Sequence, residues 1–267
     1  MHNTLKEILA LKQQQVAALK IQLTQDPHHV LAPYMQGEST RKIKSLKKAL
    51  RKPCAIIAEI KRASPASGLL AQIPDPVHLA QIYQQAGAAA ISVLTDETFF
   101  KGSLNDLLHI SSALETTDCA ILRKEFIIDE IQIAEAAHYG ADAVLLIVAA
   151  TQDKTEELLD FAHHLGLEAL VEVHTLEELD YALEIEADII GINNRNLSTL
   201  LVDIETSFAL ISEIPASRIV VSESGIKDAM TAQHLFAAGF DALLVGEALV
   251  RAEDPGELIR NMRGVAS

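Results

Sequence analysis

Six charged side chains have the types and spacing needed for acid–base chemistry on a negatively charged substrate. Each stands at the end of a short apolar run, where a half-buried charge costs free energy unless an opposite charge pairs with it. A lysine ammonium can give a proton to an oxygen that gains charge, and a carboxylate can accept one. A shared polar site explains the whole set of three bases and three carboxylates: Lys61, Lys124, Arg195, Glu59, Glu172 and Glu223.

The spacing of these residues predicts that they face the same way. The side chains of a strand alternate between its two faces, so Lys61 shares a face with Glu59. Asn193 and Arg195 are also two positions apart and are therefore predicted to share a face. Arg123 has the opposite parity to the charged set, and we therefore expect it to cover the outer side of its strand.

The elements that position these residues alternate between strand and helix patterns after Pro53. Helical patterns cover 130–138, 154–164 and 176–183, among others. Because parallel neighbours need a crossover connection, this alternation predicts a parallel sheet. The eight candidate strands are 55–60, 89–94, 120–122, 143–148, 169–173, 189–192, 219–221 and 242–245.

A repeated helix-to-strand joint indicates that the sheet closes on itself. The stretches 86–91, 139–144 and 238–243 share a glycine, a short step and an apolar run, and 185–190 is a weaker copy without the glycine. Glycine suits the left-handed residue that ends a helix. This repetition favours an α/β fold of the (β/α)8 TIM-barrel type over an open dinucleotide-binding sheet, whose Gly-x-Gly-x-x-Gly motif does not follow the first strand.

The barrel hypothesis places an anion site at two glycines. In this fold, loops after the seventh and eighth strands commonly bind phosphate, and Gly225 and Gly246 stand there. Glycine lets backbone N–H groups approach an anion closely. Ser224 adjoins the first glycine, and Ser64 offers a hydroxyl from the first loop, although an ordinary turn explains Ser64 equally well. We expect Glu247 to turn its N–H rather than its carboxylate toward a phosphate.

Residues 1–50 have the pattern of a helical extension in front of the barrel. An apolar stripe includes Ile8, Val16 and Leu23 at helical spacing, and Asp26-Pro27 breaks it. We expect the extension to pack on the rest of the chain rather than to fold alone. The chain is accordingly predicted to be one domain, 1–267, with the barrel at 51–267.

The charge balance excludes several classes of partner. The 267 residues carry a net charge of −15, and a surface that acidic repels nucleic acid and anionic membranes. The basic stretch 41–52 is the local exception. Because Ile43, Leu46 and Leu50 have helical spacing within it, we interpret this stretch as a solvated helix face, with a nucleic-acid patch as the alternative.

The cysteine and histidine patterns favour a reduced protein without a metal site. Two cysteines are too few for a disulfide framework. No apolar run reaches the roughly 18 residues of a membrane span, and the N-terminus has no signal-peptide core, so we expect a cytoplasmic protein. None of the ten histidines has a metal-ligand spacing. His174 shares a strand face with Glu172, and we interpret it as a loop residue or an indirect contributor.

Six sequence blocks resemble those of the indole-3-glycerol-phosphate synthases. They occur in order along residues 50–250, and they include IAEIKRASP at 57–65 and LRKEFIID at 122–129. The helical extension is also similar in kind to the one that helps to cover the active site in this family. The other blocks are 92–97 with 99–103, 171–174, 191–197 and 222–226.

The resemblance implies a carbon–carbon lyase of tryptophan biosynthesis that needs no cofactor. Its substrate would be 1-(2-carboxyphenylamino)-1-deoxyribulose 5-phosphate, a phosphorylated anthranilate–sugar adduct. The ring carbon that bears the carboxylate attacks the sugar ketone, and carbon dioxide and then water leave to give indole-3-glycerol phosphate. We expect a monomer or weak homo-oligomer that binds this small molecule and neither nucleic acid nor membrane.

The resemblance also implies roles for individual residues. Lys124 is the expected general acid, Lys61 lies near the substrate carboxylate as a candidate second acid, and Glu172 assists the dehydration. Glu59 is expected to orient the lysines. The remaining expected contacts are Asn193, Arg195, Glu223, Phe100 and Phe126 around the anthranilate, and Ser64, Ser224, Gly225, Gly246 and Glu247 around the phosphate.

Departures from the family pattern and alternative functions remain open at this point. Glu125 stands where the family often has aspartate, and Ala66-Ser67 stands where it often has serine and lysine, which removes a positive charge near the phosphate. Barrel lysines flanked by carboxylates also suit a Schiff-base aldolase that acts on sugar phosphates. A barrel that only binds phosphorylated ligands is the non-enzymatic alternative.

Overall fold

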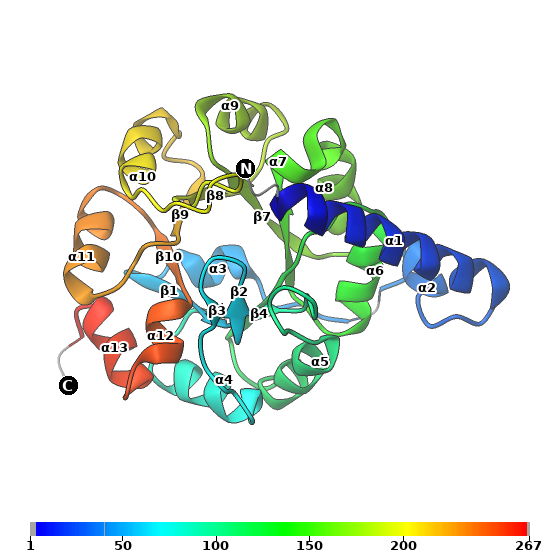
Figure 1. Cartoon of the computed structure of the whole chain (residues 1–267), viewed down its shortest axis with the longest axis horizontal. Helices are drawn as coiled ribbons and strands as arrows, with labels where there is room; N and C mark the ends of the chain where they lie inside the picture. Colours follow the sequence, from blue (N-terminus) through cyan, green and yellow to red (C-terminus); the bar gives the residue numbers. More distant parts are fainter. Residues whose placement is uncertain (1–3, 40, 266–267) are drawn as a thin grey trace.

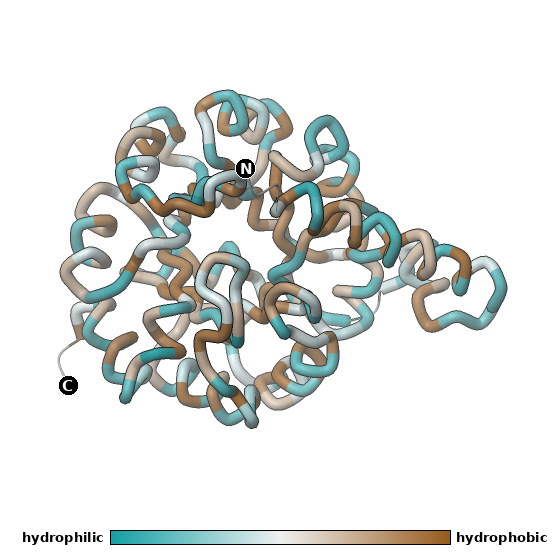
Figure 2. The backbone as a smooth tube through the Cα atoms, in the orientation of Figure 1, coloured by the Kyte–Doolittle hydropathy of each residue, from teal (hydrophilic) through white to brown (hydrophobic). Residues whose placement is uncertain are grey.

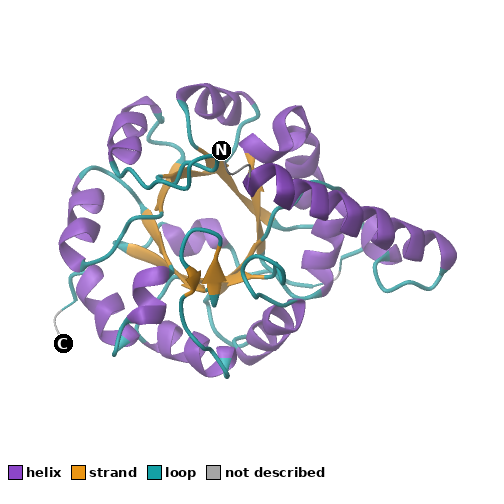
Figure 3. Cartoon of the chain, viewed as in Figure 1, coloured by secondary structure: helices purple, strands orange, loops and turns teal. Residues whose placement is uncertain are grey.

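Eight parallel strands close into a barrel in the computed structural model, which describes residues 4–39 and 41–265 (Figure 3). Strand β1 pairs with β4 on one side and with β10 on the other, which completes the ring. The predicted (β/α)8 barrel is therefore confirmed. The barrel strands are β1 (Ala55–Ile60), β4 (Ala90–Leu94), β5 (Ala120–Lys124), β6 (Ala143–Ile147), β7 (Glu168–Val173), β8 (Ile189–Asn193), β9 (Ile219–Glu223) and β10 (Ala242–Val245).

Helices surround the barrel as an outer ring (Figure 1). Several begin at a capping side chain: Asp129, for example, accepts a hydrogen bond from the N–H of Ile131 at the start of α6. In Figure 2 the outer helices alternate between hydrophilic and hydrophobic residues, as expected when one face packs on the barrel. The ring consists of α4 (Pro76–Gln85), α5 (Leu104–Ala113), α6 (Glu130–His138), α8 (Thr155–His164), α9 (Leu176–Glu184), α10 (Glu205–Leu210), α11 (Ala229–Ala237) and α13 (Pro255–Met262), together with the short α7 (Val148–Thr151) and α12 (Glu247–Arg251) and the 3-10 turns η1 (Gln152–Lys154) and η2 (Ile211–Glu213).

The barrel interior is apolar at its amino end and charged at its carboxyl end. On β5, Leu122 belongs to the interior apolar cluster, and Lys124 follows it on the same face. On β9, Glu223 follows Val221 in the same way. Arg123 points outward instead, where its Nη1 donates to a backbone carbonyl of α6 at 2.6 Å. The alternation of side chains along each strand thus delivers the charges to one end of the barrel.

A short helix closes the amino end of the barrel. The two leucines of α3 (Leu46–Leu50) are completely buried against the interior cluster. The residues before this helix bind the barrel: Arg41 donates to the carboxylate of Asp142 at 2.9 Å, and Lys44 donates to a backbone carbonyl at 2.9 Å. The interpretation of 41–52 as a solvated helix face is therefore wrong for its first half, because buried carboxylates and carbonyls of the barrel attract these cations.

The N-terminal extension forms an arm across the rim of the barrel mouth. Helix α1 (Thr4–Gln25) begins over the mouth and runs outward past α6, and the short α2 (Ala32–Met35) packs on α6 as well (Figure 1). Val16 of α1 and Leu31, just before α2, form a small apolar cluster with Ile131 of α6, and Met35 of α2 packs against it. The arm therefore packs on the barrel through apolar contacts of both helices.

A small hairpin in the first loop covers part of the mouth. Strand β2 (Ala63–Ser64) pairs antiparallel with β3 (Gly68–Leu69), and the pair lies in front of the barrel opening in Figure 1. The sequence pattern did not indicate strands in this first loop, because two-residue strands are too short to show alternation.

Two predictions concern the chain as a whole. Within the described ranges, no helix combines the length and the apolar character needed to cross a membrane. The predicted extension 1–50 and barrel 51–267 include residues 1–3, 40 and 266–267, which lie outside the described residues.

Candidate active site

A cavity of about 1170 Å³ opens at the carboxyl end of the barrel. Its walls come from the barrel strands, from the loops that follow them, and from the first turns of α1, which contribute Thr4, Leu5 and Ile8. The structure brings together every residue that the sequence predicted for the site: Glu59, Lys61, Ser64, Phe100, Lys124, Phe126, Glu172, Asn193, Arg195, Glu223, Ser224, Gly225, Gly246 and Glu247.

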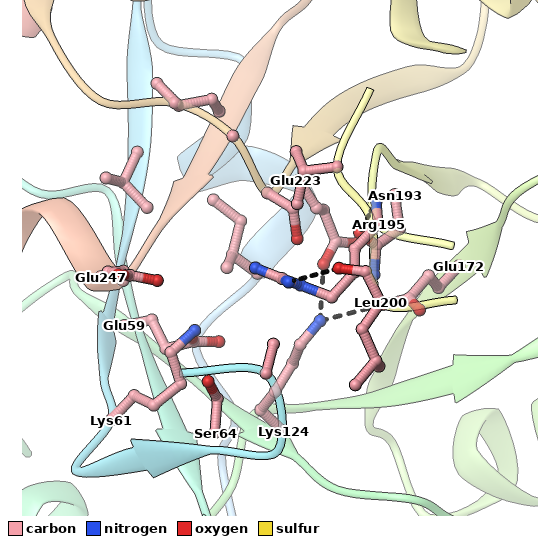
Figure 4. Close-up of a pocket in the computed structure, with 18 of the residues that line it drawn as sticks. Glu59, Lys61, Ser64, Lys124, Glu172, Asn193, Arg195, Leu200, Glu223 and Glu247 are labelled. Atoms are coloured by element: carbon pink, nitrogen blue, oxygen red, sulfur yellow. Dashed lines mark hydrogen bonds and ion pairs between the residues drawn. The ribbon is translucent and has the colours of Figure 1, made fainter. Parts of the chain in front are cut away.

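Lys124 lies at the centre of this cavity, between two carboxylates. Its Nζ is 3.0 Å from Oε2 of Glu172 and 2.5 Å from Oε2 of Glu223 (Figure 4). The three residues lie in the last two positions of β5, β7 and β9, so the barrel itself fixes their spacing. Burial alone lowers the pKa of Lys124, but the two carboxylates raise it well above its ordinary value. Lys124 is therefore an ammonium ion at neutral pH.

The two carboxylates that hold Lys124 differ in protonation. Burial opposes the charge of Glu172, yet Lys124 and His174 together lower its pKa well below the usual range. At Glu223 burial dominates and, with repulsion from Glu172, raises the pKa to about 7 despite Lys124. Carboxyl groups whose surroundings separate their pKa values are typical of acid–base sites. Glu172 is thus ionised at neutral pH, whereas Glu223 carries a proton in part of the molecules.

A second ion pair lies on the opposite side of the cavity from Glu172. Nζ of Lys61 is 2.7 Å from Oε1 of Glu59, at the end of β1 (Figure 4). Glu59 is buried, and Lys61 is only partly exposed. Gly246 packs so closely on Glu59 that an added Cβ would collide with its carboxylate. This contact gives a physical reason for a glycine at the start of α12.

The loop after β8 holds a guanidinium group over the cavity. Nη1 of Arg195 donates to the carbonyl of Leu200 at 2.9 Å (Figure 4). The backbone N–H of Arg195 donates to Oδ1 of Asn193 at 2.9 Å, and an antiparallel bridge joins Arg195 to Val202. Contacts within this loop therefore position the guanidinium of Arg195. Among the residues that the structure describes, no carboxylate forms an ion pair with it.

Two aromatic rings form an apolar wall of the cavity. The ring centroids of Phe100 and Phe126 are 6.1 Å apart and the planes are tilted by 39°. Buried carboxylates hold both backbones: Oδ1 of Asp96 accepts from the N–H of Phe100 at 3.1 Å, and Oε1 of Glu125 accepts from the N–H of Phe126 at 2.8 Å. The aromatic wall thus depends on two carboxylates that lie outside the catalytic set.

Lys12 of α1 neutralises these two carboxylates, and the sequence analysis missed it. Its Nζ is 2.8 Å from Asp96 and 2.9 Å from Glu125, and all three side chains are buried. Glu125, one of the departures from the family pattern, is thus one of the two carboxylates that Lys12 pairs with. A signal was present in the sequence, because Lys12 stands four residues from both Ile8 and Val16, on the apolar stripe of the helix.

Replacing Lys12 by methionine is expected to lower the free energy of unfolding by about 3–5 kcal/mol, because it leaves the buried carboxylate of Asp96 without a counter-charge and that of Glu125 with only the guanidinium of Arg123, 4.0 Å away. Urea denaturation measures this loss. The matched control is Lys20→Met on the same helix, whose ion pair with Asp129 is exposed and is worth at most about 1 kcal/mol. Equal losses in the two variants would contradict a role for Lys12 in docking α1.

The predicted phosphate residues gather at the loops after β1, β9 and β10. Ser224 and Gly225 follow β9 with successive positive φ angles of 67° and 83°, and Asn194 holds the turn by donating to the carbonyl of Ser224 at 3.0 Å. The carboxylate of Glu247 pairs with Arg251 at 3.1 Å. The arginine offsets a negative charge that would otherwise repel an anion here.

The donor set of the cavity suits proton transfer. The carboxylates of Glu59, Glu172 and Glu223 have lysine ammonium groups as neighbours. Across residues 4–39 and 41–265, no three His, Cys, Asp or Glu side chains are grouped so as to hold a metal ion.

With proton donors and acceptors gathered at the mouth of a (β/α)8 barrel, the molecule is a barrel enzyme built for acid–base chemistry. The family model described as "Indole-3-glycerol phosphate synthase" matches residues 5–262. The chain therefore belongs to the indole-3-glycerol phosphate synthase family and is an enzyme of this type, a carboxy-lyase of tryptophan biosynthesis.

Bacterial relatives match nearly the whole chain. The protein named indole-3-glycerol phosphate synthase from Exiguobacterium sibiricum is 44% identical over 265 residues, which cover 98% of each chain. The protein of the same name from Chlorobium chlorochromatii is 47% identical over 246 residues, or 92% of this chain and 94% of that one.

Solved structures with low sequence identity share the fold alone. Thiamine phosphate pyrophosphorylase from Pyrococcus furiosus superposes with a TM-score of 0.62 at 18% identity, over 82% of this chain and 96% of that chain. 3-Hexulose-6-phosphate synthase from Salmonella typhimurium gives 0.61 at 16% identity, over 79% and 97%.

Proposed function

We propose that the chain closes the indole ring of 1-(2-carboxyphenylamino)-1-deoxyribulose 5-phosphate, with Lys124 as the general acid. The ring carbon that bears the carboxylate forms a bond to the ketone carbon, and the electron pair of the carbonyl moves to its oxygen. Lys124 gives that oxygen a proton. Carbon dioxide then leaves, and its bonding pair restores the aromatic ring.

The dehydration that follows needs a base and an acid. The new hydroxyl group leaves as water after it gains a proton, and the neighbouring sugar carbon loses a proton to form the indole double bond. Glu172 is suited to be the base because it is ionised and lies 3.0 Å from Lys124. We assign Lys61 as the candidate second acid, with Glu59 orienting it at 2.7 Å.

The cavity offers a place for each part of the substrate. The aromatic ring fits the apolar wall of Phe100 and Phe126. We propose that the guanidinium of Arg195, with Asn193 beside it, binds the carboxylate of the anthranilate. Glu223 forms the polar floor below Lys124. At the other end the phosphate would meet backbone N–H groups and hydroxyl groups, supplied by Ser64, Ser224, Gly225, Gly246 and Glu247.

The charge state of Lys124 argues against the Schiff-base alternative. A lysine that attacks a carbonyl must be an uncharged amine, which requires a lowered pKa. The neighbours of Lys124 raise its pKa instead, so the ammonium form dominates. The position of this ammonium between Glu172 and Glu223 is the single observation that carries the proposed acid role.

Turnover of the anthranilate–deoxyribulose phosphate adduct tests the proposal. The product is an indole, and its fluorescence is easy to follow because the chain contains no tryptophan. We expect steady formation of indole-3-glycerol phosphate and release of one carbon dioxide per indole. Binding without turnover would favour the barrel that only binds phosphorylated ligands. A covalent adduct on Lys124 after borohydride treatment would favour the aldolase.

We further propose that the chain works in the cytoplasm as one domain, 1–267, and as a monomer or weak homo-oligomer. The net charge of −15 supports a surface that does not bind nucleic acid. Cell fractionation and analytical ultracentrifugation test the location and the oligomeric state.

A further inference from the structure

We propose that His174 and Glu178 form a brace behind Glu172, which aims the carboxylate of Glu172 at the substrate and keeps it ready to accept a proton. The brace makes His174 a positioning residue for the dehydration step. This inference rests on the proposed function, since it assigns Glu172 the part of the base.

The histidine ring is held between two carboxylates. Its Nε2 lies 3.3 Å from Oε1 of Glu172, and its Nδ1 lies 3.1 Å from Oε2 of Glu178. The side chain is only 11% exposed, and it does not belong to the lining of the cavity. His174 therefore reaches the reaction only through Glu172.

The start of α9 fixes the outer half of the brace. Oε2 of Glu178 also accepts the backbone N–H of His174 at 2.6 Å, so one carboxylate oxygen holds both the ring and the main chain. Thr175 caps the same helix by accepting the N–H of Glu178 at 3.2 Å. Because a helix start anchors Glu178, the ring has little freedom to turn away from Glu172.

The two oxygens of Glu172 have different cationic partners. Oε2 faces Lys124 of β5, and Oε1 faces His174. Glu223 of β9 is the other carboxylate near this group, and Glu59 of β1 adds a weaker negative field at Lys124. Lys124 is shared with Glu223, whereas the brace serves Glu172 alone. The histidine is therefore the feature that distinguishes Glu172 from Glu223.

The charge on His174 supports this geometry. Burial by itself lowers the pKa of His174, but the neighbouring carboxylates of Glu172 and Glu178 raise it to about 10. The ring is thus an imidazolium at neutral pH and stabilises the ionised form of Glu172. A neutral Glu172 could not take the proton that the sugar carbon must lose, so the brace adds to Lys124 in favouring the form of Glu172 that can act as the base.

The pH dependence of kcat tests the brace. On the acidic side of the profile, kcat falls as Glu172 takes up a proton. In His174→Gln, which keeps a hydrogen-bond donor but loses the charge, the pKa of Glu172 should rise and the acidic limb should move to higher pH by about one unit, which is tenfold in kcat on that limb. KM should stay unchanged, and raising the pH should restore kcat toward the wild-type value.

Glu178→Gln provides a second test from outside the ring. It removes the anchor of the ring and one negative charge that favours the imidazolium. The acidic limb of the kcat profile should therefore move to higher pH, but by less than in His174→Gln. The control is His109→Gln, an exposed histidine on α5, which should leave the profile in place. Because Glu178 is partly exposed, this variant is expected to fold even if the substitution of His174 prevents folding.

Two outcomes overturn the inference. A uniform loss of kcat at every pH in His174→Gln and Glu178→Gln would show a merely structural role for the pair. Profiles that coincide with wild type would show that Glu172 needs no brace. Either result, with active wild-type protein, leaves the proposed function intact, whereas failure of the wild type to form indole refutes the function itself.

Discussion

Replacing Lys124 by alanine is expected to lower kcat by about 10³-fold or more, toward the upper end of the range for general acid–base catalysis. The ketone oxygen would lose its proton donor as it gains charge. Glu172 and Glu223 would also lose the cation between them, so the pKa values of both carboxyl groups should rise. Indole fluorescence under saturating substrate measures the change, and circular dichroism checks that the barrel remains folded.

Two further substitutions separate proton transfer from charge. Lys124→Arg keeps a positive charge but does not release a proton near neutral pH, so it should fold better than the alanine variant and remain nearly as slow. Lys47→Ala is the matched control, because this lysine pairs with Asp188 at 2.7 Å and is partly exposed, and it lies on α3 at the opposite end of the barrel. Near-normal kcat in Lys124→Ala would remove Lys124 from the acid role.

Replacing Glu172 by glutamine should lower kcat by about 10²–10³-fold, because the amide cannot accept a proton in the dehydration. The substitution keeps size and shape, so we expect KM to change little. Ring closure and loss of carbon dioxide do not require this base. In a single turnover, carbon dioxide should therefore appear faster than the indole, and parallel measurement of the two products detects the accumulated intermediate.

The control for this second variant is Glu184→Gln, an exposed carboxylate in the last turn of α9, which should behave as wild type. If carbon dioxide and indole slow to the same extent in Glu172→Gln, Glu172 acts at or before the decarboxylation. That result would contradict its assignment to the dehydration.

Periodicity explains why the barrel and the gathering of its charges were predictable. The alternation of side chains along a strand needs only local sequence, so the shared face of Glu59 and Lys61 follows from their spacing. Closure of eight parallel strands then brings the ends of distant strands to one mouth. The structure accordingly places both residues in the cavity with Lys124 and Glu172.

Contacts between distant segments explain what the sequence did not show. Asp96 and Glu125 contact Lys12 in the fold but follow it by 84 and 113 positions in the sequence. Nothing in the sequence around Lys12 reveals these contacts. The same applies to Arg41 and Asp142, whose ion pair overturned the interpretation of a solvated helix. Hydrophobic periodicity and composition predict which face of a helix or strand is buried. They do not predict which distant side chain forms an ion pair there, because the tertiary structure determines that contact.

The proposed chemistry requires that the cations and carboxylates of the mouth act on one bound molecule. A crystal structure with the adduct whose ketone is reduced to an alcohol, which cannot cyclise, tests this requirement directly. We predict that Nζ of Lys124 lies about 3 Å from the alcohol oxygen, that the ring contacts Phe100 and Phe126, and that the phosphate meets the N–H groups of Gly225 and Gly246. An alcohol oxygen beyond the reach of Lys124, or a phosphate bound at another part of the cavity, would contradict the assignment.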